Sequence, residues 1–418
     1  MAGATNSYDK ALRDRALAVV PGGMWGHMNA VALPQGYPQF FARGRGSRLW
    51  DVDGNQYVDF MCSWGPVILG HHHPDVDEAV QRQLRQGDCL NGPGEAMVEL
   101  AELVVELVPH ASWVQFQKNG TDATTVAVTL ARAGTARRKI LVAEGAYHGA
   151  VPWCSPSVAG VTAEDRAHLI YYRYNDTESL ERAAEEAGAD LAGIIASAFQ
   201  HDYGKDQALP TKAFAERARQ ICDAADAALI VDDVRAGFRL GLGGSWETIG
   251  VRPDMAAWSK SIANGFALAA VTGNERFREA ATKVFSTGSF WCSAVSMAAA
   301  VATLSVLRRD DAVIHMAAMG QMLRDGFDAL SRRYGIPIRQ TGPVQMPMVL
   351  FEDDDDHAKG YAFCSAAVGC GVYFHPLHNM FISAAHTADD IVVALEAAEH
   401  GFKAVQTLRP TASGAATR

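Results

Sequence analysis

Short apolar runs alternate along the chain with longer stretches in which apolar residues recur every three or four positions. The short runs predict strands, and the periodic stretches predict helices. Strands are expected at 140–143, 169–172, 191–196, 227–231 and 255–258, and helices at 97–107, 178–187 and 212–226. Uninterrupted apolar runs are typical of parallel strands covered on both faces. The pattern therefore predicts an α/β protein whose mostly parallel sheet is flanked by helices.

The two ends of the chain carry a different pattern, which predicts a second, smaller α+β domain. An amphipathic helix is expected over residues 7–20, before the stop at Pro21-Gly22-Gly23. A long helix near 310–333 leads to strands at 344–351 and 372–374. The expected segments are an N-terminal arm that joins the small domain (1–48), a large domain (49–308) and a C-terminal small domain (309–418).

Ionisable side chains follow two of the predicted strands. Asp232 and Asp233 close the run at 227–231, and Lys260 follows the run at 255–258. Ligands in open α/β sheets bind beyond the carboxyl ends of the strands. A lysine and a carboxylate in that place suit pyridoxal phosphate, because the lysine amine can form a Schiff base with the cofactor aldehyde while the carboxylate keeps the pyridine nitrogen protonated. The pair alone fits a strand-end salt bridge equally well.

A second feature lies upstream, where a strand near residue 116 runs through Asn119-Gly120-Thr121 into an apolar-periodic helix. The N-terminus of a helix offers free N–H groups and a positive dipole end, and a glycine there permits close backbone approach, so this layout predicts a phosphate site. An ordinary helix cap by Asn119 or Thr121 is the alternative. Tyr147 follows the strand at 140–143 and could lie flat against a bound aromatic ring.

Four motifs, taken in order and with their spacing, resemble the class III aminotransferases, in the branch of glutamate-1-semialdehyde aminomutase. They are Asn-Gly-Thr-Asp-Ala-Thr at 119–124, Gly-Ala-Tyr-His-Gly at 145–149, Val-Asp-Asp-Val-Arg-Ala-Gly-Phe-Arg at 231–239 and Ser-Lys at 259–260. The resemblance covers residues 15–405. It implies a fold-type I enzyme that uses pyridoxal phosphate and works as a homodimer with shared active sites.

The resemblance also implies roles for individual residues. Lys260, Asp232 and Tyr147 are expected to be catalytic, with Tyr147 and Val234 on opposite faces of the cofactor ring. Thr287 or Ser289 is expected to reach the phosphate of the neighbouring subunit. The full set expected to bind the cofactor is Asn119, Gly120, Thr121, Tyr147, His148, Asp202, Asp232, Val234, Lys260, Thr287 and Ser289.

The chain departs from the family where the substrate is bound. Asn29 stands in the place of the arginine that grips the semialdehyde carboxylate, and Arg235 replaces a glutamine or methionine. Ser197-Ala198 replaces a Glu-Pro pair, and the segment beginning at His375 replaces the one that bears a gating glutamate. Substrate contacts are expected from Trp25, His27, Asn29, Arg235, His375 and His378.

The resulting hypothesis is an aminotransferase that moves an amino group between a small amino acid or amine donor and a keto acid or aldehyde acceptor. An aminomutase of the glutamate-1-semialdehyde type is the first alternative, which Asn29 disfavours. A second is a transaminase-derived enzyme that also eliminates water and makes an aromatic amine from a cyclic keto acid. A cofactor-binding protein without turnover is disfavoured by the presence of Lys260.

The amino-acid composition and net charge limit the classes of partner that the protein can bind. The 418 residues are 49% hydrophobic, which indicates a globular chain, and 47 acids against 37 bases give a net charge of −10. An acidic chain without a basic run argues against binding to nucleic acid or an anionic membrane. We expect neither a leader nor a membrane span, and therefore a cytoplasmic enzyme. The seven scattered cysteines predict free thiols, and adjacent histidines at 71–73 point to different sides, so no metal is expected.

Overall fold

The computed structural model describes residues 7–408, which fold into two compact units. The large unit comprises residues 63–202 and 207–316, and the small unit comprises residues 7–62, 203–206 and 317–408. None of the helices within 7–408 is both long and apolar enough to cross a membrane.

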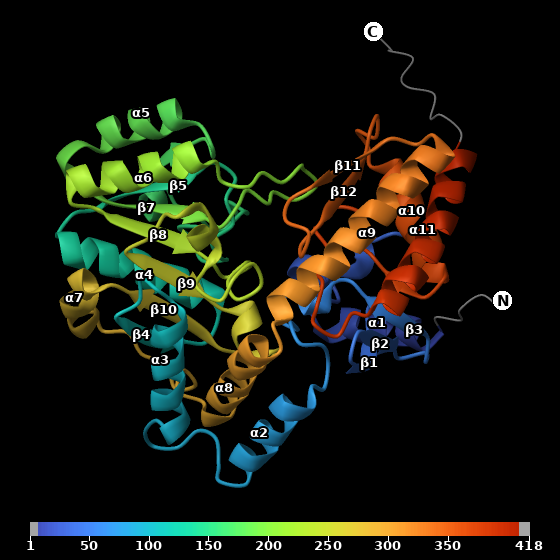
Figure 1. The fold of residues 1–418 in the computed structure, drawn as a ribbon, viewed down its shortest axis with the longest axis horizontal. Helices are drawn as coiled ribbons and strands as arrows, with labels where there is room; N and C mark the ends of the chain where they lie inside the picture. Colours follow the sequence, from blue (N-terminus) through green and yellow to red (C-terminus); the bar gives the residue numbers. More distant parts are fainter. Residues whose placement is uncertain (1–6, 409–418) are drawn as a thin grey trace. The chain divides into compact units, whose positions relative to one another are not determined.

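A seven-stranded sheet forms the centre of the large unit, in the order β4-β10-β9-β8-β7-β5-β6 (Figure 1). The strands are β4 (Trp113–Gln117), β5 (Lys139–Ala143), β6 (Leu169–Tyr172), β7 (Leu191–Ser197), β8 (Ala228–Asp232), β9 (Met255–Trp258) and β10 (Ala269–Gly273). Only β10 runs against its neighbours, so the mostly parallel sheet predicted from the sequence is confirmed. The five strands predicted at 140–258 and the strand predicted near residue 116 are all present, whereas β10 was not predicted.

Helices cover both faces of this sheet. Leu229 and Val231 of β8 pack into a core with α5 and α6, while Ala228 and Ile230 of the same strand pack into a second core with α4. Figure 1 shows α5 and α6 on one side of the sheet and α4 on the other. Both faces of the strands are thus buried, which explains why they read as continuous apolar runs. The helices of this unit are α2 (Pro74–Leu84), α3 (Glu95–Leu107), α4 (Gly120–Thr135), α5 (Thr177–Ala187), α6 (Lys212–Ala225), α7 (Arg278–Lys283) and α8 (Ala294–Arg309).

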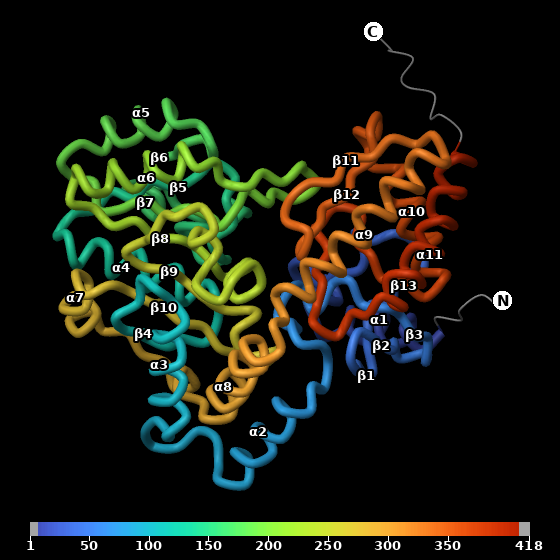
Figure 2. The backbone as a smooth tube through the Cα atoms, viewed as in Figure 1, coloured from blue at the N-terminus to red at the C-terminus, as the bar shows by residue number. Residues whose placement is uncertain are grey.

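The small unit is built from the two ends of the chain. Its four-stranded sheet has the order β1-β2-β3-β13, and β13 pairs in parallel with β3. Figure 2 shows the blue N-terminal trace beside the red C-terminal trace within this unit. The strands are β1 (Phe41–Arg45), β2 (Arg48–Asp51), β3 (Gln56–Asp59), the pair β11 (Ile338–Thr341) and β12 (Met348–Phe351), and β13 (Val372–Tyr373). The helices are α1 (Ser7–Val19), α10 (Ala358–Gly369), α11 (Ala388–Thr407) and the part of α9 (Ala312–Tyr334) from residue 317 onward.

The strand expected at 344–351 is shorter than predicted. β12 begins only at Met348, because the amide of Met346 donates to the carbonyl of Pro343 at 2.9 Å and closes a turn there. Residues 344–347 therefore form a turn, mostly buried, rather than the start of a strand.

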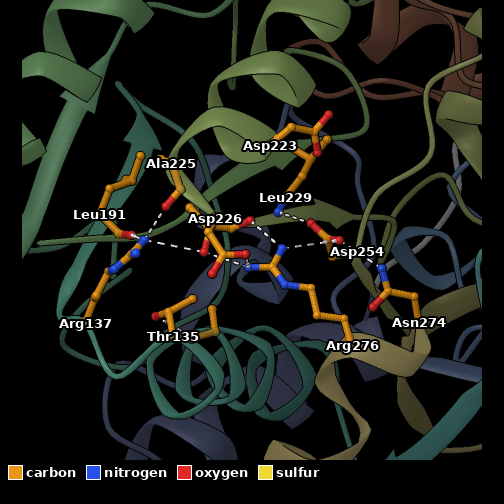
Figure 3. Close-up of polar contacts among 12 residues, drawn as sticks. Thr135, Arg137, Leu191, Asp223, Ala225, Asp226, Leu229, Asp254, Asn274 and Arg276 are labelled. Carbon is orange, nitrogen blue, oxygen red and sulfur yellow. Dashed lines mark hydrogen bonds and ion pairs between the residues drawn. The ribbon is translucent and has the colours of Figure 1, made fainter. Parts of the chain in front are cut away.

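A buried polar network lies at the amino-terminal edge of the large-unit sheet (Figure 3). Asp254 accepts hydrogen bonds from the amide of Leu229 and from Arg219 and Asn274, each at 2.8 Å. Arg276 donates to the carbonyls of Asp226 and residue 227 at 2.6 and 3.1 Å. These side chains satisfy backbone groups where the strands begin, so this edge of the sheet is occupied by structural contacts.

We expect replacement of Asp254 by alanine to lower the free energy of unfolding by about 3 kcal/mol, because Arg219 and the Leu229 amide lose a buried acceptor. Asp223→Ala is the matched control, since Asp223 also pairs with Arg219 but its side chain is 64% exposed. That control should cost less than about 1 kcal/mol. Denaturant unfolding of the two variants measures the difference, and equal losses would contradict the assignment.

Candidate functional site

A cavity of about 340 Å³ opens at the carboxyl-terminal edge of the large-unit sheet. Side chains that follow β4, β5, β7, β8 and β9 all reach it, as expected for the edge at which parallel strands present their ends. The lining includes Asn119, Gly120, Thr121, Tyr147, His148, His201, Asp232, Val234, Arg235 and Lys260. The structure therefore brings together ten residues from segments far apart in the sequence.

Lys260 follows β9 directly, with its backbone in the left-handed region at φ 38°. Its Nζ donates a hydrogen bond of 2.9 Å to the carbonyl of Trp64. Burial, and secondarily the positive charge of Arg235, lower the pKa of the Lys260 amine to about 7. An amine with this pKa is largely uncharged just above neutral pH, so it can act as a nucleophile or a base.

Asp232 is the last residue of β8 and is held by two donors. His148 Nδ1 lies 2.7 Å from its Oδ2, and the amide of Val234 donates to its Oδ1 at 3.1 Å. The side chain of His148 is completely buried, so it orients the carboxylate from behind. The next residue, Asp233, accepts a 3.0 Å bond from the amide of Ser245 and does not line the cavity. Adjacent strand positions face opposite ways, which separates the two carboxylates.

The start of α4 forms another wall of the cavity. Asn119 caps this helix, because its side chain accepts from the amide of Asp122 while its own amide donates to the Asp122 carboxylate, both at 3.2 Å. Asn119 thus caps the helix, and Asn119, Gly120 and Thr121 at the helix start also line the cavity. A side chain at Gly120 would come within 2.6 Å of Val234, so the glycine lets the helix start approach that residue closely.

Three further residues contribute to the cavity wall. Tyr147 is 43% exposed, and burial of the remainder raises the pKa of its hydroxyl. Arg235 lies in the same wall, where burial lowers the pKa of its guanidinium to about 10. His201 was not predicted as a site residue, although its position just beyond the end of β7 is a signal that could have identified it. Burial and the charge of Arg235 lower the pKa of His201, so its imidazole is neutral.

Three residues predicted to bind the cofactor do not line this cavity. The carboxylate of Asp202 lies beside Gly145 and accepts a 3.2 Å bond from Gln200. Thr287 and Ser289 are exposed on the segment between α7 and α8, and Thr287 lines a separate cavity.

The remaining predicted substrate residues belong to the small unit. Asn29 uses its amide inside its own loop, where it accepts from the amide of Val31 and donates to the carbonyl of Met24, both at 2.9 Å. Trp25 and His27 are exposed. His375 is buried, which lowers the pKa of its imidazole to about 3, and its ring lies 5.9 Å from that of His378. Asn29 therefore stabilises its loop, and the imidazole of His375 is uncharged.

The chemistry of the lining residues fits pyridoxal phosphate. The cofactor has an aldehyde, a pyridine nitrogen, a phosphate and two flat faces. The cavity offers the uncharged amine of Lys260, the His148-backed carboxylate of Asp232, and the N-terminus of a sixteen-residue helix. Tyr147 and Val234 supply an aromatic and an aliphatic surface. Each group of the cofactor thus has a complementary group in one cavity.

Comparisons with known proteins agree with this fit. A family model described as aminotransferase class-III matches residues 32–407. Aminopentol aminotransferase of Sphingopyxis macrogoltabida is 48% identical over 96% of this chain and 95% of its own. Glutamate-1-semialdehyde 2,1-aminomutase of Chloroherpeton thalassium is 32% identical over 94% and 97%.

Two solved structures of related proteins have the same fold. The PLP internal aldimine form of the FumI protein of Sphingopyxis sp. MTA144 superposes with a TM-score of 0.95, at 48% identity over 96% of this chain and 98% of that one. An omega-transaminase of Sphaerobacter thermophilus superposes with a TM-score of 0.87 at 26% identity, over 96% and 98%. The chain belongs to the class III aminotransferases, pyridoxal phosphate-dependent enzymes of fold-type I.

Proposed function

We propose that this aminotransferase takes its amino group from an amine that carries several hydroxyl groups, and passes it to a keto acid. The donor class rests on the Sphingopyxis macrogoltabida relative, which is named for an aminopentol and is 48% identical. The commitment of the Asn29 amide to its own loop supports the proposal, because a carboxylate-bearing semialdehyde would need a cation there. Arg235, whose planar fork suits a carboxylate, is our candidate for holding the keto acid.

Within this proposal, Lys260 holds the cofactor. When bound, pyridoxal phosphate supplies an aldehyde that takes up the amino group and a ring that withdraws electrons from the adjacent carbon. The amine of Lys260 then moves a proton between the substrate carbon and the C4′ atom of the cofactor. Asp232 keeps a proton on the ring nitrogen, and His148 keeps Asp232 oriented. The single observation that carries these roles is the shared cavity of the uncharged Lys260 amine and the Asp232 carboxylate.

A substrate comparison tests the donor class. We expect an amine with several hydroxyl groups to convert the bound cofactor to its amine form with a kcat/KM at least about tenfold above that of the alkylamine of equal chain length, because polar groups of the site are left unpaired by the alkylamine. Single-turnover absorbance measures both. Faster conversion of the plain alkylamine would contradict the proposal.

The aminomutase is the second candidate, favoured by the 32% identical relative that carries this name. A transaminase releases a carbonyl product for each amino group it takes, whereas a mutase releases none. We expect glutamate-1-semialdehyde to be isomerised at less than about one hundredth of the rate of the best donor, since a lost bidentate arginine costs about 3 kcal/mol. Brisk isomerisation would overturn the choice.

We further propose that the active unit is a homodimer in which Thr287 or Ser289 contacts the phosphate bound by the partner subunit. The exposure of both hydroxyls, and their absence from the cavity of their own large unit, support this arrangement. Phe285 and Phe290 on the same segment are 93% and 60% exposed, and apolar surface of this kind is suited to an interface.

Subunit mixing tests the shared site. The double variant Thr287→Ala, Ser289→Ala should lose activity at limiting cofactor, and Lys260→Ala should lose it at any cofactor concentration. Random reassociation of the two should restore about a quarter of wild-type activity, because half the dimers are mixed and each has one intact site. No restoration, or full activity in a monomeric fraction during sedimentation, would contradict the proposal.

A further inference from the structure

The surroundings of the Lys260 amine lack a hydrogen-bonded counter-ion. Its acceptor, the carbonyl of Trp64 at 2.9 Å, is uncharged. No carboxylate within residues 7–408 forms an ion pair with this amine, because the nearby Asp232 is already bonded to His148 and the Val234 amide. A buried ammonium without a paired anion is costly, whereas a neutral amine donates to a carbonyl without that cost.

The Trp64 carbonyl is presented by an unusual backbone. Cys62, Ser63 and Trp64 have φ values of 47°, 55° and 64°, in the left-handed region that disfavours non-glycine residues by about 1–2 kcal/mol each. The carbonyl of the next residue, Gly65, accepts a 2.7 Å bond from the fully buried Arg239, which fixes the peptide beside Trp64. The segment is therefore held in place, and the acceptor of the lysine is not an incidental contact.

Charged side chains also lie in the cavity that contains the amine and behind the Trp64 segment. Arg235 shares the cavity wall with Lys260, and Arg239 lies behind the Trp64 segment. Asp232 is the attractive group, and the neutral His201 completes the set. Burial is the main cause of the lowered pKa of the Lys260 amine, and the charge of Arg235 is the next, ahead of Asp232 and Arg239.

We propose that Arg235 is a positioning residue whose fixed positive charge adds to the effect of burial and helps to keep the Lys260 amine uncharged, so that it can capture the cofactor and accept the substrate proton. This inference rests on the proposed function of Lys260 and adds a second role to Arg235. The positive charge of the guanidinium disfavours a charge on Lys260, and its planar set of N–H donors binds the carboxylate of the keto acid. A lysine at position 235 keeps the positive charge and loses the planar set of donors.

The test measures the charge state of Lys260 in the full-length protein freed of cofactor. Competitive acetylation across pH, followed by peptide mass spectrometry, gives the midpoint at which Lys260 becomes reactive, with the exposed Lys10 as an internal reference. Arg235→Gln and Arg235→Met should each raise this midpoint by about one pH unit, because one nearby positive charge is removed. Arg235→Lys should keep the midpoint within about 0.3 unit while raising KM for the keto acid.

Arg173→Gln is the matched control, since it removes a positive charge from the surface of the same unit and should leave the midpoint unchanged. The visible absorbance of the bound cofactor, titrated in the holoenzyme, should shift in the same direction as the acetylation midpoint. An unshifted midpoint in Arg235→Gln and Arg235→Met overturns the inference, and so does an equal shift in Arg235→Lys. If borohydride labelling finds the cofactor on another lysine while the midpoint still moves, the proposed function fails and the electrostatic inference stands.

Discussion

Lys260→Ala should abolish amino transfer, with a loss of at least about 10⁴-fold in kcat, because the variant has neither an amine to hold the cofactor nor a base to move the proton. The uncharged state of this amine, with its pKa lowered to about 7 by burial, is what makes it suitable for both steps. Added small amines should restore part of the proton transfer and leave cofactor attachment unrepaired. Steady-state kinetics and the absorbance of the bound cofactor measure the two effects separately.

Lys139→Ala is the control for this loss. The Lys139 amine donates to the carbonyl of Glu186 at 2.9 Å and does not line the cavity, so its removal should leave kcat within about twofold of the wild type. Borohydride reduction of the holoenzyme, followed by peptide mapping, should place the cofactor on Lys260. A label on any other lysine would falsify the assignment.

Asp232→Asn should retain the fold and lose at least about 100-fold in kcat, which corresponds to about 2.7 kcal/mol. An amide keeps the size of the carboxylate and can still accept from the Val234 amide, but it has no charge with which to hold a proton on the ring nitrogen. The neighbouring His148 also loses its anionic partner at 2.7 Å. A loss below about tenfold would contradict the role given to Asp232.

Asp233→Asn is the matched control on the adjacent residue. Its activity should fall much less, because Asp233 faces Ser245 instead of the cavity. Burial raises the pKa of Asp233 from 3.8 to about 6. The folded protein therefore binds a proton more tightly than the unfolded chain, and this contribution to stability is lost as the pH rises from about 4 to about 6. The difference in unfolding free energy between the wild type and Asp233→Asn isolates this contribution, and it should become less favourable to the wild type as the pH rises through this range.

The sequence by itself determined the architecture around the site. The uninterrupted apolar runs ending at Asp232 and before Lys260 identified β8 and β9, and the residues that follow strand ends identified the cavity. These predictions succeed because burial on both faces of a parallel sheet leaves a strong local signal, and because strand direction fixes the edge at which polar side chains gather.

Only the tertiary structure decided what each of these residues contacts. β10 lies between β4 and β9 and runs against both, an arrangement that no local pattern encodes. A side chain at Gly120 would come within 2.6 Å of Val234, which lies far away in the sequence, so the neighbours of Gly120 do not indicate this close approach.

The hydrogen-bond acceptor of Lys260 could not be predicted from the sequence either. The amine donates to the carbonyl of Trp64, which lies 196 positions away in the sequence. The backbone of residues 62–64 is left-handed although none of them is a glycine, so the sequence does not indicate this conformation. The sequence determines periodicity and strand ends, because both depend on near neighbours and on burial. Contacts between distant segments depend on how the elements pack in three dimensions. The charge state of Lys260 depends on such contacts, so only the tertiary structure determines it.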